Sequence, residues 1–198
     1  MNVPTSPLIH LVDDDAAVRD GLALLISTVG LRVQTWADPQ AFLQGFERDA
    51  IGAIVLDVRM AGLSGLAVLD RLQAERVDQP VVMLTGHGTV DLCRRAFKNG
   101  AAEFLEKPVD DEVLLETLQN AVRQHVRSRE RQQADRRSRE RFALLSERER
   151  EVLSLIVAGL TNKEVGRALD LSPRTVETHR ANLFAKLGAA SLAQLIRQ

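Results

Sequence analysis

The chain has 198 residues, of which 45% are hydrophobic and 27% are charged. These values exclude a largely disordered chain and allow one large domain or two small ones. The net charge of −1 conceals an asymmetry, because residues 1–122 carry 10 Lys and Arg against 18 Asp and Glu, whereas residues 123–198 carry 16 against 9. An acidic N-terminal part and a basic C-terminal part indicate two modules with different partners, and nucleic acid is the expected partner of the C-terminal part.

The longest apolar runs fall far short of the roughly 20 residues that a membrane helix needs. The N-terminus shows no basic region ahead of an apolar stretch, so no secretory signal is expected. Cys93 is the single cysteine, which excludes an internal disulfide and fits a reducing compartment. Its more ordinary interpretation is a small buried hydrophobic side chain. We therefore expect a cytoplasmic protein with no membrane partner.

The first 120 residues alternate between short apolar runs and longer stretches with helical spacing. Runs rich in β-forming residues are expected to be strands at 8–12, 31–36, 51–56, 80–84 and 102–105. Five helices alternate with them, which predicts an α/β doubly wound domain with a five-stranded parallel sheet. The three central strands are apolar on both sides, as buried parallel strands are. The working site of such a fold lies beyond the carboxyl ends of the strands, at a switch point in the strand order.

Acidic and polar residues stand at those strand ends. Asp13 and Asp14 follow the first strand, Asp57 the third, Thr85 the fourth and Lys107 the fifth. A strand order of 2-1-3-4-5 would bring these ends side by side. Clustered carboxylates need a cation, and their hard oxygen atoms suit Mg²⁺. A metal, a lysine and a hydroxyl would together stabilise a phosphoryl group that passes onto a carboxylate.

This arrangement resembles the bacterial receiver domain over the whole first part of the chain. The matching residues are Asp13-Asp14, Asp57-x-x-Met60-x-Gly62, Thr85 and Lys107-Pro108. The resemblance implies a flavodoxin-like fold, Mg²⁺ as cofactor and a sensor histidine kinase as partner. It also implies that Asp57 is the phosphoacceptor, that Asp14, Asp57 and the backbone carbonyl of Arg59 are the Mg²⁺ ligands, and that Asp13 completes the acidic site mostly through water. By the same resemblance, Lys107 pairs with the Asp57 carboxylate and then with the phosphoryl group, and Thr85 forms a hydrogen bond to a phosphoryl oxygen. Phe104 is the aromatic residue expected to shift when Thr85 does.

Several neighbouring positions would modify this site. Receiver domains usually have Pro where this chain has Ala61, a difference that loosens the loop without removing a chemical group. Arg59 and His87 follow the acceptor and Thr85 by two positions each, so we expect both to overhang the phosphoryl group and to tune dephosphorylation. Asp15 is expected to cap the first helix instead of joining the site.

A helix is expected to begin near Asp110 and to run through 112–141, where there is no Pro or Gly. Its later part is almost wholly polar, with eight Arg and three acidic residues between positions 123 and 141. We interpret 123–144 as an Arg-rich helical linker that joins a receiver domain at 1–122 to a second domain at 145–198. The alternative is a lever that also touches DNA phosphates.

Four short helices with strong caps are predicted in the last domain, at 147–158, 162–169, 173–187 and 191–197. The start signals are two capping boxes and a Ser-Pro pair, and glycines mark two helix ends. These signals are Ser146-x-x-Glu149, Thr161-x-x-Glu164, Ser172-Pro173, Gly159 and Gly188.

This domain resembles the LuxR-type helix-turn-helix domain, and the resemblance rests on the segment LSEREREVLSLIVAGLTNKEVGRALDLSPRTVETHRANLFAKL. The resemblance implies a scaffold helix at 161–170 and a recognition helix at 173–187. A helical wheel agrees, because Val176, Leu183 and Leu187 share one face and the opposite face is small and able to form hydrogen bonds, as major-groove binding requires. The residues expected to contact bases are Glu177, Thr178, Ala181 and Arg174, of which Arg174 can reach either a guanine or a phosphate. Those expected to contact the DNA backbone are Lys163, Thr175, His179, Asn182 and Lys186.

Residues 145–198 hold 8 basic and 6 acidic groups, too small an excess for one copy to bind DNA strongly. Two copies on a two-fold-symmetric site would provide the affinity, and the resemblance implies homodimers with helix 191–197 in the interface. We therefore expect a transcriptional response regulator similar to nitrogen-fixation regulators, in which phosphorylation promotes dimerisation and binding to promoter DNA. No enzymatic activity is expected beyond its own phosphotransfer and dephosphorylation.

Two other classes of function share some of these features. A phosphohydrolase of the haloacid-dehalogenase type also uses Asp, Mg²⁺, Thr and Lys, but it needs a second acid two residues after the nucleophile, where this chain has Arg59. A receiver-like domain that signals without phosphate would usually lack the acceptor Asp or the Lys, and both are present.

Overall fold

The computed structural model describes residues 6–189 and 191–195. The chain divides into two compact units, Met1–Arg129 and Glu130–Gln198, and each has a hydrophobic core of its own. No helix within the described ranges is both long enough and apolar enough to cross a membrane.

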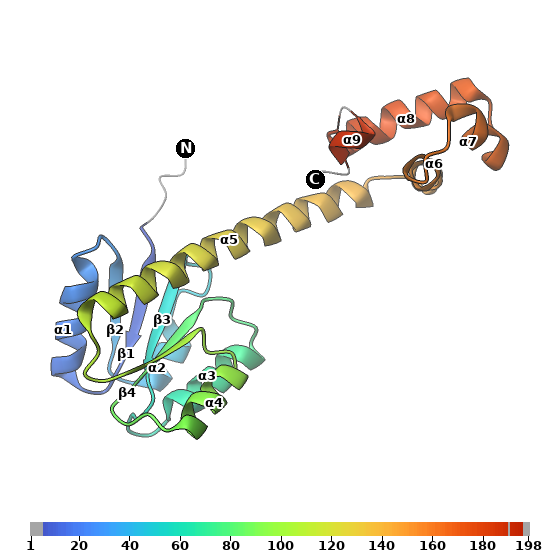
Figure 1. The fold of residues 1–198 in the computed structure, drawn as a ribbon. Coiled ribbons are helices and arrows are strands. Elements are labelled where there is room, and N and C mark those ends of the chain that lie inside the picture. Colours follow the sequence, from blue (N-terminus) through green and yellow to red (C-terminus); the bar gives the residue numbers. More distant parts are fainter. Residues whose placement is uncertain (1–5, 190, 196–198) are drawn as a thin grey trace. The chain divides into compact units, whose positions relative to one another are not determined.

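A five-stranded, all-parallel sheet forms the centre of the first unit (Figure 1). Its strands are β1 (Leu8–Val12), β2 (Arg32–Trp36), β3 (Gly52–Asp57), β4 (Val81–Thr85) and β5 (Glu103–Glu106). They lie in the order β2-β1-β3-β4-β5. Every residue of β1, β3 and β4 is buried, which explains why these strands are continuous apolar runs in the sequence. The predicted fold class of this unit is confirmed.

Helices cover both faces of the sheet. They are α1 (Ala16–Ser27), α2 (Pro39–Gly45), α3 (Gly65–Ala74), α4 (Val90–Lys98) and α5 (Asp111–Ala143). On one face, Ile26 of α1 and Leu114 of α5 pack into one core cluster. On the other, Phe42 of α2 and Leu69 of α3 pack into a second. Cys93, on α4, is a free and half-buried thiol.

The length and the burial pattern of helix α5 agree with the amino-acid composition of this segment. It runs without interruption to Ala143, so the segment expected to be a helical linker is helical nearly throughout. Its buried positions end at His125, and from residue 130 to its end every side chain is exposed. The helix therefore has an apolar face only in its first part, where it covers the sheet.

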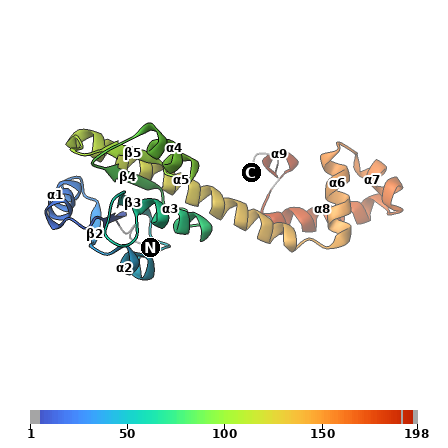
Figure 2. The same ribbon diagram turned by 90° about the horizontal axis from the view of Figure 1, so that it is seen from below.

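The second unit holds the end of α5 and four further helices. They are α6 (Glu147–Val157), α7 (Asn162–Leu169), α8 (Pro173–Leu187) and α9 (Leu192–Leu195). The first three gather into one bundle in both ribbon views (Figures 1 and 2), around a core that includes Val152, Val165 and Leu183. Both predicted capping boxes are formed. Residues 196 and 197 of the predicted last helix lie outside the described residues.

Candidate functional site

The polar residues predicted at the strand ends meet at one edge of the sheet. Asp13 and Asp14 directly follow β1, Asp57 ends β3, Thr85 ends β4 and Lys107 directly follows β5. These four strands are neighbours in the sheet and run in the same direction, so their carboxyl ends lie at the same edge. Of these side chains, Lys107 makes the contacts that organise the site.

Lys107 joins two buried carboxylates. Its Nζ lies 2.6 Å from Oδ2 of Asp13 and 2.6 Å from Oδ1 of Asp57. The second oxygen of Asp57 accepts a hydrogen bond of 2.7 Å from the backbone N–H of Arg59. Two carboxylates and one ammonium leave an excess negative charge in a place that water reaches poorly, and such a site favours a further cation.

Burial has opposite effects on the acid and the base of this site. Burial raises the pKa of the Asp57 carboxyl, and the nearby charge of Asp13 adds to the effect, while Lys107 opposes it. Burial by itself lowers the pKa of Lys107, but its hydrogen bonds to Asp13 and Asp57 outweigh burial and raise that pKa. Lys107 therefore stays charged, whereas the ionised form of Asp57 is less favoured here than in water and would be stabilised by a metal ion nearby.

Asp14 lies outside this lysine network. It is exposed, and its Oδ2 accepts a hydrogen bond of 2.8 Å from the backbone N–H of Ala61. Over residues 6–189 and 191–195, no group of three or more His, Cys, Asp or Glu side chains is arranged to hold a metal ion. Mg²⁺ commonly takes only one or two carboxylates and keeps several waters. The oxygen atoms of Asp14, Asp57 and the Arg59 carbonyl are of the type that this cation requires.

The loop after β4 lies against the end of β5. The hydroxyl of Thr85 is 3.3 Å from both the N–H and the carbonyl of His87, within a tight turn. The N–H of Gly88 donates a hydrogen bond of 3.1 Å to the side chain of Glu106. Phe104 is half-buried and packs against the core. The contact between Gly88 and Glu106 was not predicted, because a glutamate at a strand end has no distinctive pattern.

Two residues near the acceptor position have structural roles. Asp15 caps α1 by accepting hydrogen bonds from the N–H groups of Ala17 and Val18, at 2.8 and 3.2 Å, so the prediction of a cap is confirmed. Gly65, the first residue of α3, was not predicted to have a structural role at the site. A Cβ at Gly65 would lie 2.1 Å from the carbonyl oxygen of Asp57, so any larger residue would displace the acceptor strand. The side chains of Arg59 and His87 are exposed.

In the second unit, α7 and α8 form a helix-turn-helix. The turn passes through Asp170, which has a left-handed backbone with φ of 56°. Ser172 then begins α8, where its hydroxyl accepts a hydrogen bond of 3.1 Å from the N–H of Thr175. Val176, Leu183 and Leu187 are the buried residues of α8, as the helical wheel predicted.

The opposite side of α8 is open to solvent. Its exposed residues include Arg174, Glu177, Thr178, Ala181 and Asn182, and Lys163 on α7 is also exposed. Thr175 and His179 are half-buried. Two of the predicted contact residues already use their hydroxyls within the unit, because Thr175 Oγ1 lies 2.8 Å from Ser172 and Thr178 Oγ1 donates to the Arg174 carbonyl at 3.1 Å.

Lys186, which was predicted to contact the DNA backbone, forms an ion pair within the second unit. Its Nζ lies 2.7 Å from Oε2 of Glu149, whose side chain is only 5% exposed. The same oxygen accepts a hydrogen bond of 2.7 Å from the N–H of Ser146. The hydrogen bond from Lys186 makes the largest contribution to lowering the pKa of Glu149, and the hydrogen bond from Ser146 makes the next largest. Lys186 therefore connects α8 to the start of α6, a long-range contact that the pattern of one helix could not indicate.

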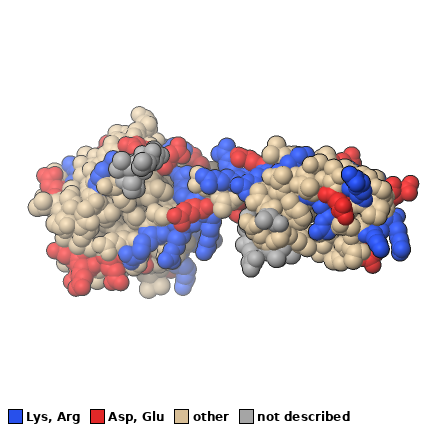
Figure 3. Space-filling model, turned by 90° about the horizontal axis from the view of Figure 1, so that it is seen from above, with Lys and Arg blue, Asp and Glu red and all other residues tan. Residues whose placement is uncertain are grey.

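A second polar contact holds α8 against α7. Arg180 donates a hydrogen bond of 2.9 Å from Nη1 to Oδ1 of Asn162, and its guanidinium lies over the ring of Phe184. On the face drawn in Figure 3, the basic and acidic side chains of the second unit are interspersed, without one continuous basic block. Residues 130–198 hold 13 basic and 9 acidic groups, and this small excess agrees with the mixed distribution.

Comparison with known proteins identifies both units. The family model described as response regulator receiver domain matches residues 9–119, and the model described as bacterial regulatory proteins, luxR family, matches residues 143–198. The chain belongs to the response regulators. This response regulator is 42% identical over 189 residues to the transcriptional regulatory protein FixJ of Bradyrhizobium diazoefficiens, covering 96% of this chain and 92% of that protein.

Solved structures give the same result. The response regulator StyR matches with a TM-score of 0.90 and 35% identity, over 98% of both chains. Full-length FixJ from B. japonicum matches with a TM-score of 0.61 and 41% identity, over 98% of this chain and 96% of that one. The response regulator is thus a FixJ-like transcriptional regulator with a receiver domain and a LuxR-type DNA-binding domain. Its domains imply a histidine kinase and DNA as partners, and receiver domains generally bind Mg²⁺ for phosphorylation.

Proposed function

We propose that a histidine kinase phosphorylates this response regulator on Asp57, and that phosphorylation promotes dimerisation and promoter binding. One observation carries the proposal: Lys107 Nζ lies 2.6 Å from both Asp57 and Asp13 at the carboxyl edge of the sheet. A charged lysine there holds the Asp57 carboxylate in place and can follow the phosphoryl group when it arrives.

The transfer requires few groups. An oxygen of Asp57 attacks the phosphorus of a phosphohistidine, so that a P–O bond forms, the P–N bond breaks and the imidazole leaves. Asp14, Asp57 and the Arg59 carbonyl would hold Mg²⁺, with Asp13 contributing through water. When bound there, the metal would supply positive charge that offsets the negative charge of the transferring phosphoryl group. Lys107 pairs with one of the phosphoryl oxygens, and the hydroxyl of Thr85 donates to another.

Phosphorylation would change the surface formed by α4, β5 and the start of α5. The phosphoryl group carries roughly −1.5 to −2 charge and takes the place of the single negative charge of the Asp57 carboxylate. Thr85 must then exchange its contact with the His87 turn for the phosphoryl group, which leaves space that half-buried Phe104 can fill. Contact between two receiver domains through this surface would bring two copies of α8 onto half-sites about one helical turn apart. The gain in affinity then comes mainly from effective concentration and not from new base contacts.

The proposed chemistry is confined to the protein itself. The response regulator would catalyse its own phosphotransfer and dephosphorylation and no other reaction. Arg59 stands where a phosphohydrolase of the haloacid-dehalogenase type needs an acid, which leaves that activity without a proton donor. With promoter DNA as its partner, the protein would act in the bacterial cytoplasm.

The proposal is tested with the Asp57→Asn variant. Wild-type protein is incubated with a small acyl phosphate and Mg²⁺, and the phosphorylated residue is identified by mass spectrometry. We expect labelling of Asp57, sedimentation as a dimer and tighter binding to a two-half-site promoter, all of which Asp57→Asn should lose. The exposed Asp20→Asn variant is the matched control and should keep all three. Normal labelling of Asp57→Asn, or a phosphorylated protein that stays monomeric on DNA, would contradict the phosphoacceptor or the dimerisation step respectively.

A further inference from the structure

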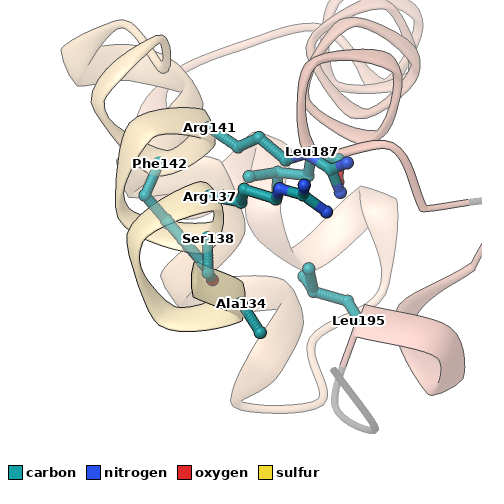
Figure 4. A pocket seen from close by; sticks show the side chains of 7 residues that line it. All are labelled: Ala134, Arg137, Ser138, Arg141, Phe142, Leu187 and Leu195. Carbon is teal, nitrogen blue, oxygen red and sulfur yellow. The ribbon is translucent and has the colours of Figure 1, made fainter. Parts of the chain in front are cut away.

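The second unit contains a cavity of about 340 Å³, and its lining includes none of the residues proposed above for phosphorylation or DNA contact. Its lining comes from the end of α5, the last residue of α8 and the last residue of α9 (Figure 4). The lining residues are Ala134, Arg137, Ser138, Arg141, Phe142, Leu187 and Leu195. The volume is at the lower end of the range for small-molecule sites, about 300–1,000 Å³. Only a compact ligand fits.

Two arginines extend over this cavity from neighbouring turns of α5. Figure 4 shows the side chains of Arg137 and Arg141 reaching side by side toward Leu187. Arg137 makes no hydrogen bond or ion pair with any other residue that the structure describes, in 6–189 or 191–195. Like charges four residues apart on a helix repel each other. An anion between the two guanidinium groups would turn this repulsion into attraction.

Arg141 is oriented by a hydrogen bond to the end of α8. Its Nη1 donates a hydrogen bond of 3.1 Å to the carbonyl of Leu187, at the end of α8. The next residue, Gly188, has φ of 66°, and a Cβ there would lie 3.1 Å from Nη1 of Arg141. The glycine therefore leaves room for the guanidinium. One of the two cationic groups is already oriented before any ligand binds, which lowers the entropy cost of binding.

The rest of the lining is mostly apolar. Leu195 of α9 faces the arginines across the cavity in Figure 4, and Ala134 lies beside it on α5. Phe142 is 41% exposed, although an aromatic ring of this size gains from burial. A ligand that carries an apolar group as well as a negative charge would cover these side chains. Inorganic phosphate or a DNA phosphate would leave them in water.

We propose that this cavity, the Arg137–Arg141 pocket, binds a small organic carboxylate with a compact apolar body, such as an aromatic acid. The carboxylate pairs with the two guanidinium groups, whose planar donors match its two oxygens. The apolar body packs against Phe142, Leu187 and Leu195. Because these side chains belong to α5, α8 and α9, the ligand would connect the end of α5 to the DNA-binding helices. The regulator would then respond to a metabolite independently of Asp57.

Titration of the full-length protein with three probes tests the chemistry of the ligand. Benzoate has the proposed charge and body, benzamide has the body without the charge, and inorganic phosphate has the charge without the body. Isothermal calorimetry should show benzoate binding, with benzamide and phosphate each weaker by at least about tenfold, as expected for loss of charge-assisted hydrogen bonds or of apolar contact. No binding at millimolar benzoate, or phosphate binding as tightly as benzoate, overturns the proposal.

Variants test the location. Arg137→Gln should weaken benzoate binding by at least about tenfold, whereas Arg139→Gln, an equal loss of charge outside the lining, should not change it. Ala134→Phe keeps both arginines and fills the cavity, so it should also abolish binding. Circular dichroism confirms that each variant remains folded. Equal losses in Arg137→Gln and Arg139→Gln, or unchanged binding in Ala134→Phe, show that benzoate binds elsewhere and overturn the assignment.

Discussion

The backbone N–H of Ala61 donates a hydrogen bond of 2.8 Å to Oδ2 of Asp14. Proline, which receiver domains usually have at this position, has no N–H to donate. In this chain one oxygen of a proposed Mg²⁺ ligand is therefore already a hydrogen-bond acceptor, which leaves fewer of its lone pairs free for a metal ion. Alanine at this position thus affects the acidic site directly, in addition to the expected loosening of the loop.

Restoring proline at this position should strengthen metal binding. Ala61→Pro removes the competing hydrogen bond; a bond to a charged group contributes about 1.5–3 kcal/mol when buried, and less at an exposed carboxylate such as Asp14. We expect Mg²⁺ to bind a few-fold more tightly, as measured by calorimetry on the unphosphorylated protein. Ala61→Gly keeps the N–H and should bind Mg²⁺ like the wild type. Unchanged or weaker binding by Ala61→Pro would show that the hydrogen bond does not limit metal affinity.

Loss of the Asp57 charge should stabilise the receiver domain in a pH-dependent manner. Burial raises the folded-state pKa of Asp57 above its ordinary value of 3.8, so the folded state binds this proton more tightly than the unfolded state. The contribution of Asp57 to the stability of the wild type then falls as pH rises from about 3.8 through the folded-state pKa. The Asp57→Asn variant cannot ionise at this position. The difference in free energy of unfolding between the variant and the wild type should therefore increase as pH rises from about 3.8 to the folded-state pKa of Asp57, and remain constant above it. Urea titrations followed by fluorescence of Trp36, the single tryptophan, measure the difference. An advantage that does not vary with pH would contradict the burial effect.

The contact between Glu149 and Lys186 should stabilise the second unit except in acid. Hydrogen bonds from Lys186 and Ser146 lower the pKa of Glu149 below its ordinary value of 4.5. The stabilisation is therefore complete above about 4.5 and disappears as pH falls through the folded-state pKa. Glu149→Gln should lower the free energy of unfolding by about 1–3 kcal/mol near neutral pH, measured by circular dichroism, and by less in acid. Glu147→Gln, on the same helix and exposed, should have little effect. A comparable loss in both variants would indicate a general effect of helix charge.

Salt dependence separates a lysine that contacts DNA from one that positions the helix. Lys163→Met should reduce the slope of log affinity against log salt by about 0.9 for each phosphate that the variant no longer contacts. Lys186→Met should weaken binding at every salt concentration without changing that slope, because its ammonium is engaged by Glu149. Fluorescence anisotropy with promoter DNA at several salt concentrations measures both. A reduced slope in Lys186→Met would show that Lys186 does contact a phosphate.

Arg59 and His87 should affect only the lifetime of the phosphorylated form. Both side chains are exposed beside the acidic site, where they can screen or orient the attacking water. Arg59→Ala and His87→Ala should change the rate of dephosphorylation with little change in the rate of loading, as followed by the phosphorylated fraction over time. Equal changes in both rates would place these residues in the transfer step instead.

The sequence by itself determined the elements and the chemistry at the strand ends. Strand periodicity, continuous apolar runs and helix caps depend on neighbours within a few residues, so they can be read locally. This is why the strand order, the capping boxes and the buried face of α8 all agree with prediction. Lys107 was also expected beside Asp57, because parallel strands bring their carboxyl ends to one edge.

Only the tertiary structure decided which polar atoms pair across long distances in the chain. Asp14 and Ala61 are 47 residues apart, and Glu149 and Lys186 are 37 apart. Each pair depends on the packing of separate elements, which neither periodicity nor a motif specifies. The same is true of Arg137 and Arg141, whose polar run indicated a solvated helical linker or a lever that touches DNA phosphates. Their position over a cavity follows from contact with the ends of α8 and α9, where a carbonyl and a glycine make room for a guanidinium.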